Sequence, residues 1–540
     1  MIKSNWNVKI KGQGLSVNEI FSKFWRSRGI ANPTEFLSPD YYFINPAAEM
    51  KNMKTAANIF IDAIDNWSKI LVYADVDTDG CSSAAIIKHY IDKLGFECSV
   101  CINKGKVHGI QKETLEGREF DLLIVVDSIN DDTKIYEDLL ASGKKIIVLD
   151  HHIPKQDVLD IAEKINLVSS AVDYINPNLS GSGVCWKFVS YIDELTGNNY
   201  ADELLDLAAT GIVADVCSLG ADSMENRAIC NIGFRMINNV GLKAIVGKES
   251  MTSTDVGFSV GPIVNAANRM NENELALELF LTGSPVRAKE LIKDLTKLKE
   301  KQKKLSQEIV DKLTMSQLNS QVNNKFYYFI VGDDCENLAG LIATRLSATY
   351  HRPVMVLHES ADKYAGSMRA EGVEDFSKII NESGYAECVG HENAAGVTIY
   401  KDKFSEFISY IKAVLENITL ETRESVDISL DRAQVTPFIL QQVQQVNRIS
   451  GAGFAPVTFL IENVNNYELT KMSNGKHLCI KVPDMKFIKW NFSDWDKVPE
   501  NGRISFIGTL EESAYGGRKT VNMMIEDFAA ETTPRKTALW

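Results

Sequence analysis

The stretch KIIVLDHHIP (residues 145–154) joins the pattern of a buried strand to three polar side chains in a row. Its apolar run is typical of a strand in a parallel sheet that is covered on both faces. Asp150, His151 and His152 follow directly, and Pro154 ends the strand because proline cannot donate to a sheet ladder. We therefore expect a buried strand whose end carries groups that bind metals or move protons.

Two similar strands precede this one along the chain. KILVYADVD (69–77) and FDLLIVVDS (120–128) are apolar runs that end in carboxylates, and helical stretches such as SAAIIKHYIDKLG (83–95) lie between the runs. Strands that alternate with helices predict βαβ units, and hence a doubly wound parallel α/β sheet between about residues 55 and 215. Ligands of such sheets bind at the carboxyl ends of the strands, which is where the acidic residues lie.

The first acidic cluster, ADVDTDG (74–80), has aspartates at alternate positions. If the segment is extended, Asp75, Asp77 and Asp79 point to the same side before a helix begins near Ser82. Three carboxylates on one side repel one another unless a cation neutralises them. The alternative is a solvated acidic strand end.

Further metal donors follow the other strands. Asp127 ends the second strand, where an aspartate can also cap the next helix, and the two adjacent histidines could belong to a polar loop. Asp215 lies in the apolar helical stretch AATGIVADV (208–216), where a buried carboxylate without a partner is costly. Carboxylates with imidazoles indicate Mn²⁺ or Mg²⁺. The donors suffice for two ions about 3.5–4 Å apart, an arrangement suited to phosphoester hydrolysis.

The rest of the chain divides into further units. We predict a long connecting helix over residues 287–320, a second, smaller α/β unit, and a β-rich region that suits a small barrel. The expected domains are an N-terminal lead-in at 1–50, the catalytic α/β domain at 51–250, a linker with the long helix at 251–322, the second α/β domain at 323–420 and the barrel at 424–530.

Composition restricts the class of protein. The 540 residues carry a net charge of −14 and are 45% hydrophobic, as expected of a globular protein. Nine cysteines without framework spacing indicate reduced thiols. No run reaches the roughly 18 apolar residues that span a bilayer, so we expect a cytoplasmic protein. Residues 287–304 are locally basic, which fits a DNA-binding groove and a solvated helix face equally well.

The order DVDTDG, VVDS, LDHH and GIVADV is similar to that of the DHH phosphoesterase superfamily, and later motifs resemble its RecJ branch of single-strand exonucleases. These later motifs are SGSGVCWKF (180–188), GPIVNAANRM (261–270), CENLAGLIATRLSATYHRPVMVL (335–357), VGHENAAGVTI (389–399), RISGAGFAPVTFL (448–460) and KHLCIKV (476–482). The resemblance implies a DHH core, a DHHA1 domain and an OB-fold-like barrel.

The resemblance also implies roles for individual residues. Metal ligands would be Asp77, Asp79, Asp127, His151 and Asp215, with Asp127 bridging two ions. Asp75 and Asp150 would be ligands or would orient ligands, and His152 would contact the scissile phosphate. Substrate contacts would come from Arg269, near the 5′ phosphate, and from Arg345, Ser367, Arg369, Gly390 and His391, with Lys106 and His108 as further candidates.

The implied activity is that of a metal-dependent 5′-to-3′ exonuclease that degrades single-stranded DNA to mononucleotides in DNA repair and recombination. It would use two Mn²⁺ or Mg²⁺ ions and act as a monomer, with a single-stranded-DNA-binding protein or a helicase as candidate partners. Two alternatives remain: a phosphodiesterase of oligonucleotides or cyclic dinucleotides, which the β-rich C-terminal region disfavours, and an inactive DNA-binding scaffold, which the retained ligands disfavour. The chain departs from the family pattern at Ser128, Ile263, Asn268 and Val389, which bears on substrate grip.

Overall fold

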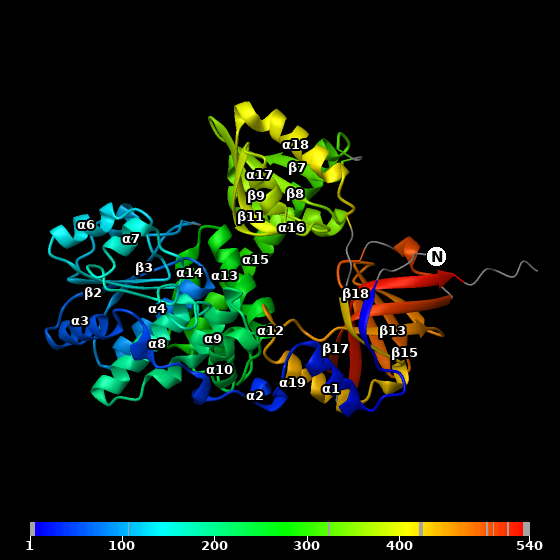
Figure 1. Ribbon diagram of the computed structural model, residues 1–540, viewed down its shortest axis with the longest axis horizontal. Coiled ribbons are helices and arrows are strands. Elements are labelled where there is room, and N and C mark those ends of the chain that lie inside the picture. Colours follow the sequence, from blue (N-terminus) through cyan, green and yellow to red (C-terminus); the bar gives the residue numbers. More distant parts are fainter. Residues whose placement is uncertain are drawn as a thin grey trace, which may run out of the picture.

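The computed structural model describes residues 6–105, 107–321, 324–420, 425–492, 495–499, 502–515 and 518–532. Within these ranges the chain forms an α/β core, a smaller α/β domain joined to the core by a long helix, and a C-terminal β domain (Figure 1). Each body has its own sheet, of five, five and eight strands respectively.

The core sheet is parallel throughout and has the strand order β3-β2-β4-β5-β6. Its strands are β2 (Ile70–Ala74), β3 (Ser99–Ile102), β4 (Leu122–Val126), β5 (Lys145–Asp150) and β6 (Leu167–Ser169). The helices that pack on it include α3 (Met53–Asp65), α4 (Thr78–Lys93), α6 (Lys134–Ala141), α7 (Gln156–Asp160) and α8 (Gly181–Thr196).

Alternation along the strands builds two separate hydrophobic layers. Val72 and Ile124 face a cluster that contains residues of α3, α4 and α8, whereas Tyr73 and Val125 face one that contains residues of α6 and α7. Successive strand residues point to opposite faces, so runs that are apolar at every position are needed to cover a sheet on both sides. The predicted doubly wound parallel sheet is confirmed.

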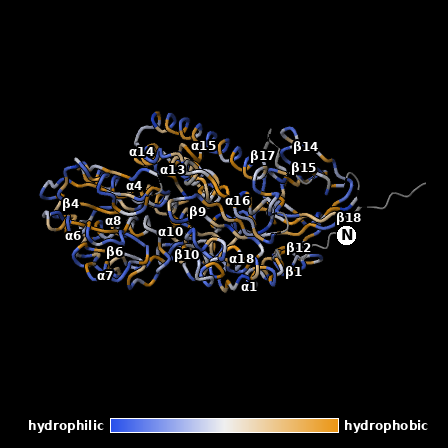
Figure 2. The backbone as a smooth tube through the Cα atoms, turned by 90° about the horizontal axis from the view of Figure 1, so that it is seen from above, coloured by the Kyte–Doolittle hydropathy of each residue, from blue (hydrophilic) through white to orange (hydrophobic). Residues whose placement is uncertain are grey.

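The remaining helices extend the core on the side of the sheet that carries α4 and α8, except for α5, which packs on the opposite side through Leu115. They are α5 (Lys112–Leu115), α9 (Leu205–Ala214), α10 (Met224–Gly233), α11 (Val240–Val246), α12 (Ser253–Asp255), α13 (Gly261–Arg269), α14 (Asn273–Leu281) and α15 (Pro285–Leu313). At 1.5 Å per residue, α15 is about 44 Å long. Leu291 and Leu295 pack in the core, and Leu313 packs in the second domain. Hydrophobic and hydrophilic residues alternate along this helix, which runs at one edge of the molecule (Figure 2).

The second α/β domain has a mixed sheet of order β10-β11-β9-β8-β7, in which only β7 and β8 run parallel among the described pairs. Its elements are β7 (Tyr327–Val331), α16 (Ala339–Tyr350), β8 (Val354–Glu359), β9 (Lys363–Arg369), α17 (Phe376–Glu382), β10 (Ala386–His391), β11 (Ala394–Tyr400) and α18 (Phe404–Glu416).

The C-terminal domain incorporates the beginning of the chain. It comprises β1 (Asn7–Lys11), α1 (Val17–Ser27), α2 (Pro33–Leu37), β12 (Ser425–Leu430), α19 (Pro437–Asn447), β13 (Phe459–Val464), β14 (Glu468–Met472), β15 (His477–Val482), β16 (Met485–Lys489), β17 (Gly502–Tyr515) and β18 (Arg518–Thr532). Strand β1 pairs in parallel with β12, with Asn7 opposite Ser425. The rings of Phe24 and Trp25 in α1 pack against Phe454. Much of the segment that we predict as a lead-in is therefore structurally part of the β domain.

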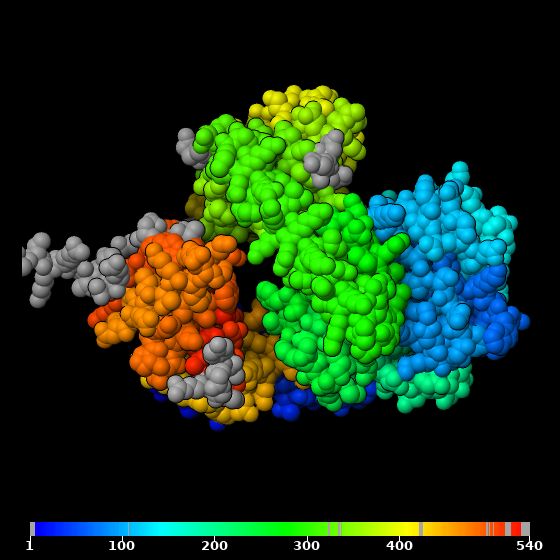
Figure 3. Space-filling model, turned by 180° about the vertical axis from the view of Figure 1, so that it is seen from behind, coloured from blue at the N-terminus to red at the C-terminus, as the bar shows by residue number. Residues whose placement is uncertain are grey.

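A buried arginine connects the core to the C-terminal domain. Arg227 of α10 donates hydrogen bonds to the backbone carbonyls of Leu219, Phe36 and Ile449, and its guanidinium lies 3.7 Å from the centre of the Phe36 ring. Beyond this junction, Figure 3 shows an opening between the C-terminal domain and the other two bodies. Within the described ranges, every helix is too short or too polar to cross a bilayer.

Candidate metal centre and active site

The candidate site lies at the carboxyl edge of the core sheet. Strands β2, β4 and β5 are adjacent, so the residues that follow them converge. Three overlapping groups have their donor atoms within 4.8 Å of one another: Asp75, Asp77 and Asp127; Asp127, His151 and His152; and His151, Asp215 and Cys217. The donors predicted from separate motifs thus form one cluster.

The loop after β2 differs from our expectation of an extended acidic segment. Strand β2 ends at Ala74 and α4 already begins at Thr78, because Asp77 caps the helix by accepting a hydrogen bond from the backbone N–H of Gly80. Asp79 therefore lies in the first helical turn, and Gly80 is helical as well. A Cβ atom at Gly80 would lie 2.4 Å from the backbone oxygen of Asp75.

Asp79 joins the loop to the next helix of the core. Its two carboxylate oxygens accept hydrogen bonds from the backbone N–H groups of Gly181 (2.7 Å) and Ser182 (3.1 Å) at the start of α8. Its Oδ2 lies 4.0 Å from Nε2 of His151. Both oxygens of this predicted metal ligand thus already accept hydrogen bonds from the protein backbone.

Asp127 is the most conspicuous unsatisfied group of the cluster. It is 1% exposed, adopts a left-handed φ of 55°, and its Oδ1 makes no hydrogen bond. Burial, together with the nearby charges of Asp79 and Asp77, raises the pKa of the Asp127 carboxyl well above its ordinary value. Burial and the charges of Asp75 and Asp79 likewise raise the pKa of Asp77 to about 7. A divalent cation would relieve both penalties, so these residues fit a metal centre.

His151 lies between two of these carboxylates. Its Nε2 is 3.2 Å from Oδ1 of Asp127 and 3.6 Å from Oδ2 of Asp215, and this buried nitrogen makes no hydrogen bond. Asp215 follows the last residue of α9 and takes the C-cap position, so it is at a helix end and not within the helix. Burial and Asp79 raise the pKa of Asp215.

Two glycines leave the space that these carboxylates occupy. A Cβ atom at Gly181 would lie 2.6 Å from Oδ1 of Asp127, and one at Gly211 would lie 1.9 Å from Oδ1 of Asp79. Gly211, within the AATGIVADV stretch, was not among the residues singled out from the sequence. Cys217 was not singled out either. Its position two residues after Asp215 is the sequence feature that could have indicated it.

Asp150 and His152 form a separate hydrogen-bonded pair. Oδ1 of Asp150 accepts from Nδ1 of His152 at 2.8 Å, and the acid is fully buried. Burial alone would raise the pKa of Asp150, but the hydrogen bond and charge of His152 outweigh it and lower that pKa. Burial would lower the pKa of His152, but its hydrogen bond to Asp150 and the charge of that carboxylate raise the pKa to about 9.

The loop between β3 and α5 brings one more imidazole to the cluster. Nδ1 of His108 lies 3.2 Å from Oδ2 of Asp75, and the His108 ring stands edge-on to the His152 ring at 4.7 Å. Its other predicted member, Lys106, lies outside the described residues. Ser128, where the family pattern has Asn, is fully buried and accepts a hydrogen bond from the backbone N–H of Gly109 in this loop.

Two arginines from different domains meet near the core. Arg269 ends α13 and Arg369 ends β9; burial and the charge of Arg369 lower the pKa of Arg269. Within the described residues neither guanidinium has a carboxylate partner, and Nε of Arg269 is buried without a hydrogen bond. A Cβ atom at Gly340 would lie 3.2 Å from Arg369 and 3.4 Å from Oγ of Ser367, so these two predicted contacts share one face of β9. This arrangement suits an anion.

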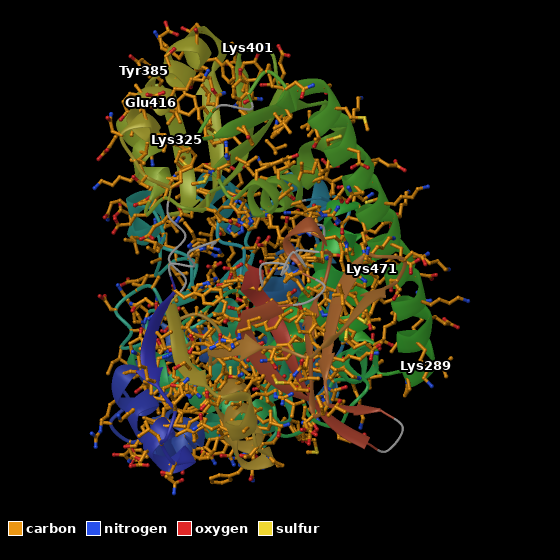
Figure 4. All side chains as sticks on the ribbon, turned by 90° about the vertical axis from the view of Figure 1, so that its right-hand side faces the viewer. Lys289, Lys325, Tyr385, Lys401, Glu416 and Lys471 are labelled. Atoms are coloured by element: carbon orange, nitrogen blue, oxygen red, sulfur yellow. The ribbon has the colours of Figure 1, made fainter. Side chains whose placement is uncertain are left out.

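The other predicted substrate contacts are spread over the second domain. Arg345 on α16 reaches Gln307 of α15 at 3.5 Å, and Gly390 and His391 are exposed at the end of β10. Val389, in place of the first Gly of the family motif, is 80% exposed beside them. The basic side of α15 is solvated at Lys289, which points away from the body of the molecule (Figure 4).

Comparison with known proteins agrees with this architecture. The DHH family N-terminal domain matches residues 69–212, the DHHA1 domain matches 323–417 and the RecJ OB domain matches 426–527. The chain belongs to the RecJ-type DHH phosphoesterases. All three domains of this family lie in the order and at the places where the structure has its three bodies.

Individual relatives cover most of the chain at low identity. The putative SPbeta prophage-derived single-strand DNA-specific exonuclease YorK of Bacillus subtilis is 26% identical, over 95% of this chain and 96% of its own. The single-stranded-DNA-specific exonuclease RecJ of Bacillus subtilis is 25% identical, over 89% of this chain and 64% of its own. The crystal structure of Thermus thermophilus RecJ with Mn²⁺ superposes with a TM-score of 0.77 at 23% identity, covering 98% of this chain and 80% of that one, which establishes the common fold.

Proposed function

We propose that this RecJ-type protein is a metal-dependent exonuclease that degrades single-stranded DNA from the 5′ end and releases mononucleotides. The observation that carries the proposal is the buried cluster at the carboxyl edge of the core sheet, in which Oδ1 of Asp127 and Nε2 of His151 face each other at 3.2 Å without a hydrogen bond. The relatives named as single-strand DNA-specific exonucleases support the substrate.

The residues that would hold the metal are Asp77, Asp79, Asp127, His151 and Asp215, with Asp75 beside them. Bound Mn²⁺ or Mg²⁺ supplies Lewis-acid chemistry, in that it lowers the pKa of a water ligand and offsets the charge of phosphate oxygens. The protein contributes a rigid frame, because the strand ends and the first turns of α4 and α8 fix most of these carboxylates.

His152 is the residue that we assign to the scissile phosphate. With a pKa of about 9, its ring carries both protons at neutral pH. The Nδ1 proton is donated to Asp150, which leaves the Nε2 proton free for a phosphate oxygen. An imidazolium held in this way stabilises the charge that develops on the oxygens during hydrolysis. Asp150 is then a positioning residue, and His108 extends the same edge toward the substrate.

The end of the DNA strand would be bound by Arg269, Arg369 and Ser367. Two guanidiniums that have no carboxylate partner among the described residues suit a terminal phosphate. We assign 5′-to-3′ polarity because of the resemblance, which places Arg269 near the 5′ phosphate. We assign Arg345, Gly390 and His391 to the following backbone phosphates, and Lys106 to the same role by resemblance alone. The OB-type domain would bind the strand further from the cut, since such domains bind single strands in grooves.

Cellular context follows from the same proposal. We infer that the protein acts as a monomer in the cytoplasm, in DNA repair and recombination, and receives single strands from a helicase or a single-stranded-DNA-binding protein. The nine cysteines all lie among the described residues and form no disulfide, which suits a reducing compartment.

The test is digestion of single strands labelled at either end, in Mn²⁺ or Mg²⁺. We expect label release first from the 5′ end, little attack on duplex DNA, and a preference for long strands over dinucleotides. Asp77→Ala is the control, and it should bind DNA without cutting it. Substrate that survives with a folded, metal-loaded protein would overturn the proposal, and faster cutting of dinucleotides would support an oligonucleotide phosphodiesterase instead.

A further inference from the structure

A cysteine thiol lies within reach of the metal centre. Sγ of Cys217 is 3.5 Å from Oδ2 of Asp215, and the donor atoms of Cys217, Asp215 and His151 all lie within 4.8 Å of one another. The roles inferred above for the metal centre involve only carboxylates and imidazoles. A sulfur atom at this place changes which ions the centre prefers.

The end of α9 explains why the thiol faces this way. The backbone N–H of Asp215 bonds to Gly211, and that of Cys217 bonds to Ile212, five residues back. This is the pattern of a helix end that reverses through a left-handed residue, and Val216 takes that place with a φ of 59°. The reversal turns the residues on either side of Val216, Asp215 and Cys217, to the same side, although neighbours two apart on a helix do not face each other.

The donors beside Cys217 independently indicate an ion. Nε2 of His151 is buried without a hydrogen bond, 3.6 Å from Oδ2 of Asp215. On its other side, at 3.2 Å, is Oδ1 of Asp127, which also lacks a hydrogen bond in a residue that is 1% exposed. Zinc-like ions bind N, O and S donors at about 2.0–2.3 Å, so donors that already lie this close need only small shifts.

The two ends of the cluster have unlike donor sets. Asp75, Asp77 and Asp127 offer only oxygen, which suits Mg²⁺ and Mn²⁺. His151, Asp215 and Cys217 offer nitrogen, oxygen and sulfur, the mixture that Zn²⁺, Co²⁺ and Cd²⁺ prefer.

We propose that Cys217 is a metal ligand, and that the position bounded by His151, Asp215 and Cys217 selects thiophilic divalent ions over Mg²⁺. The sulfur binds as the thiolate and its proton passes to solvent. This inference rests on the proposed metal-dependent function only in that both use the same cluster. It adds a consequence, namely that Zn²⁺ or Cd²⁺ competes at one position with the ions that support hydrolysis.

The experiment is a titration of the metal-free full chain with Co²⁺, without DNA, followed by absorption spectroscopy. We expect a thiolate-to-cobalt charge-transfer band in the near ultraviolet for the wild type and for the control Cys230→Ser, whose thiol lies in the same domain against the carbonyl of Ala209. The band should be absent in Cys217→Ser and Cys217→Val. Cd²⁺ affinity, measured by calorimetry, should fall by at least about tenfold in both, since even loss of a partner of a ligand has that effect.

Each outcome decides one of the two proposals. Cobalt that binds to the wild type without the charge-transfer band, or a band that persists in both Cys217 variants, overturns the role of Cys217 and leaves the proposed function standing. Absence of any cobalt, manganese or magnesium binding contradicts the proposed function itself. If the variants do not fold, ¹¹³Cd NMR of the wild type decides, because a sulfur ligand moves the cadmium resonance far downfield and an all-oxygen or nitrogen site does not.

Discussion

Both carboxylate oxygens of Asp150 accept hydrogen bonds inside the protein, and Oδ1 holds His152. Oδ1 accepts hydrogen bonds from the ring Nδ1 and from the backbone N–H of His152, both at 2.8 Å, and Oδ2 accepts one from the backbone N–H of Ile129 at 2.7 Å. The side chain is 0% exposed. These hydrogen bonds support our proposal that Asp150 acts through His152 and not as a metal ligand.

Replacing Asp150 should separate catalysis from metal binding. In Asp150→Asn, the amide cannot accept from both histidine N–H groups and the Ile129 N–H together, so His152 loses its fixed orientation and its added charge. We expect hydrolysis to fall by about 100-fold, while Mn²⁺ affinity measured by calorimetry changes far less. Asp127→Asn is the matched control and should weaken Mn²⁺ binding strongly. If Asp150→Asn weakens Mn²⁺ binding as much as the control does, Asp150 is a ligand.

The arginine pair should set the preference for a phosphorylated 5′ end. Loss of a charge-assisted hydrogen bond to phosphate costs about 1.5–3 kcal/mol, so Arg269→Gln and Arg369→Gln should each raise KM for a 5′-phosphorylated strand by about 10- to 100-fold. Rates on strands with a 5′ hydroxyl should change much less. Arg118→Gln is the control, because Arg118 is exposed and precedes β4, at the opposite edge of the core sheet. Equal effects on both kinds of strand would argue against a terminal-phosphate pocket.

Sequence patterns predict the core well because the end of each strand can be recognised in the sequence. Each apolar run stops at a carboxylate, and parallel pairing then brings Asp75, Asp127 and Asp150 to one edge. The error at Asp77 and Asp79 has a local cause. The sequence does not distinguish an aspartate that caps a helix from one that extends a strand. The hydrogen bond from the backbone N–H of Gly80 to Asp77 shows that Asp77 is a cap.

Contacts between distant segments carry no such signal. Asn7 pairs with Ser425 in the sheet of the C-terminal domain, and periodicity within either segment cannot reveal a partner so far along the chain. The approach of Arg269 to Arg369 likewise depends on how α15 sets the second domain against the core. Only the resemblance to a family indicated that each of these arginines contacts the substrate, and it gave no role to Cys217.

The backbone at Val216 should be strained, and substitution by glycine should relieve this strain. A β-branched residue with a φ of 59° costs about 1–2 kcal/mol, and Val216 is 64% exposed, so little packing is lost on its removal. We expect Val216→Gly to raise the free energy of unfolding of the core by about 1 kcal/mol in urea titrations. The control Val213→Gly, in the last turn of α9, should lower it by about 1 kcal/mol or more, because the change removes a side chain that packs against the core and places glycine in a helix. Destabilisation by both variants would mean that the Val216 side chain makes contacts worth more than the strain.

Asp206 should make the core less stable as the pH rises. The acid is 1% exposed, and although it accepts hydrogen bonds from the backbone N–H groups of Asn238 and Asn239, burial raises its pKa to about 6 from an unfolded value of 3.8. Between these two values the folded state binds more protons than the unfolded state, so this group lowers the free energy of unfolding as pH increases. Between about pH 5 and pH 7.5 the decrease should be about 1.4 kcal/mol. Other groups contribute too, so the quantity to measure is the difference between wild type and Asp206→Asn in urea unfolding at both pH values. That difference should favour the wild type by about 1.4 kcal/mol more at the lower pH, and a difference that stays constant would show that Asp206 ionises normally in the fold.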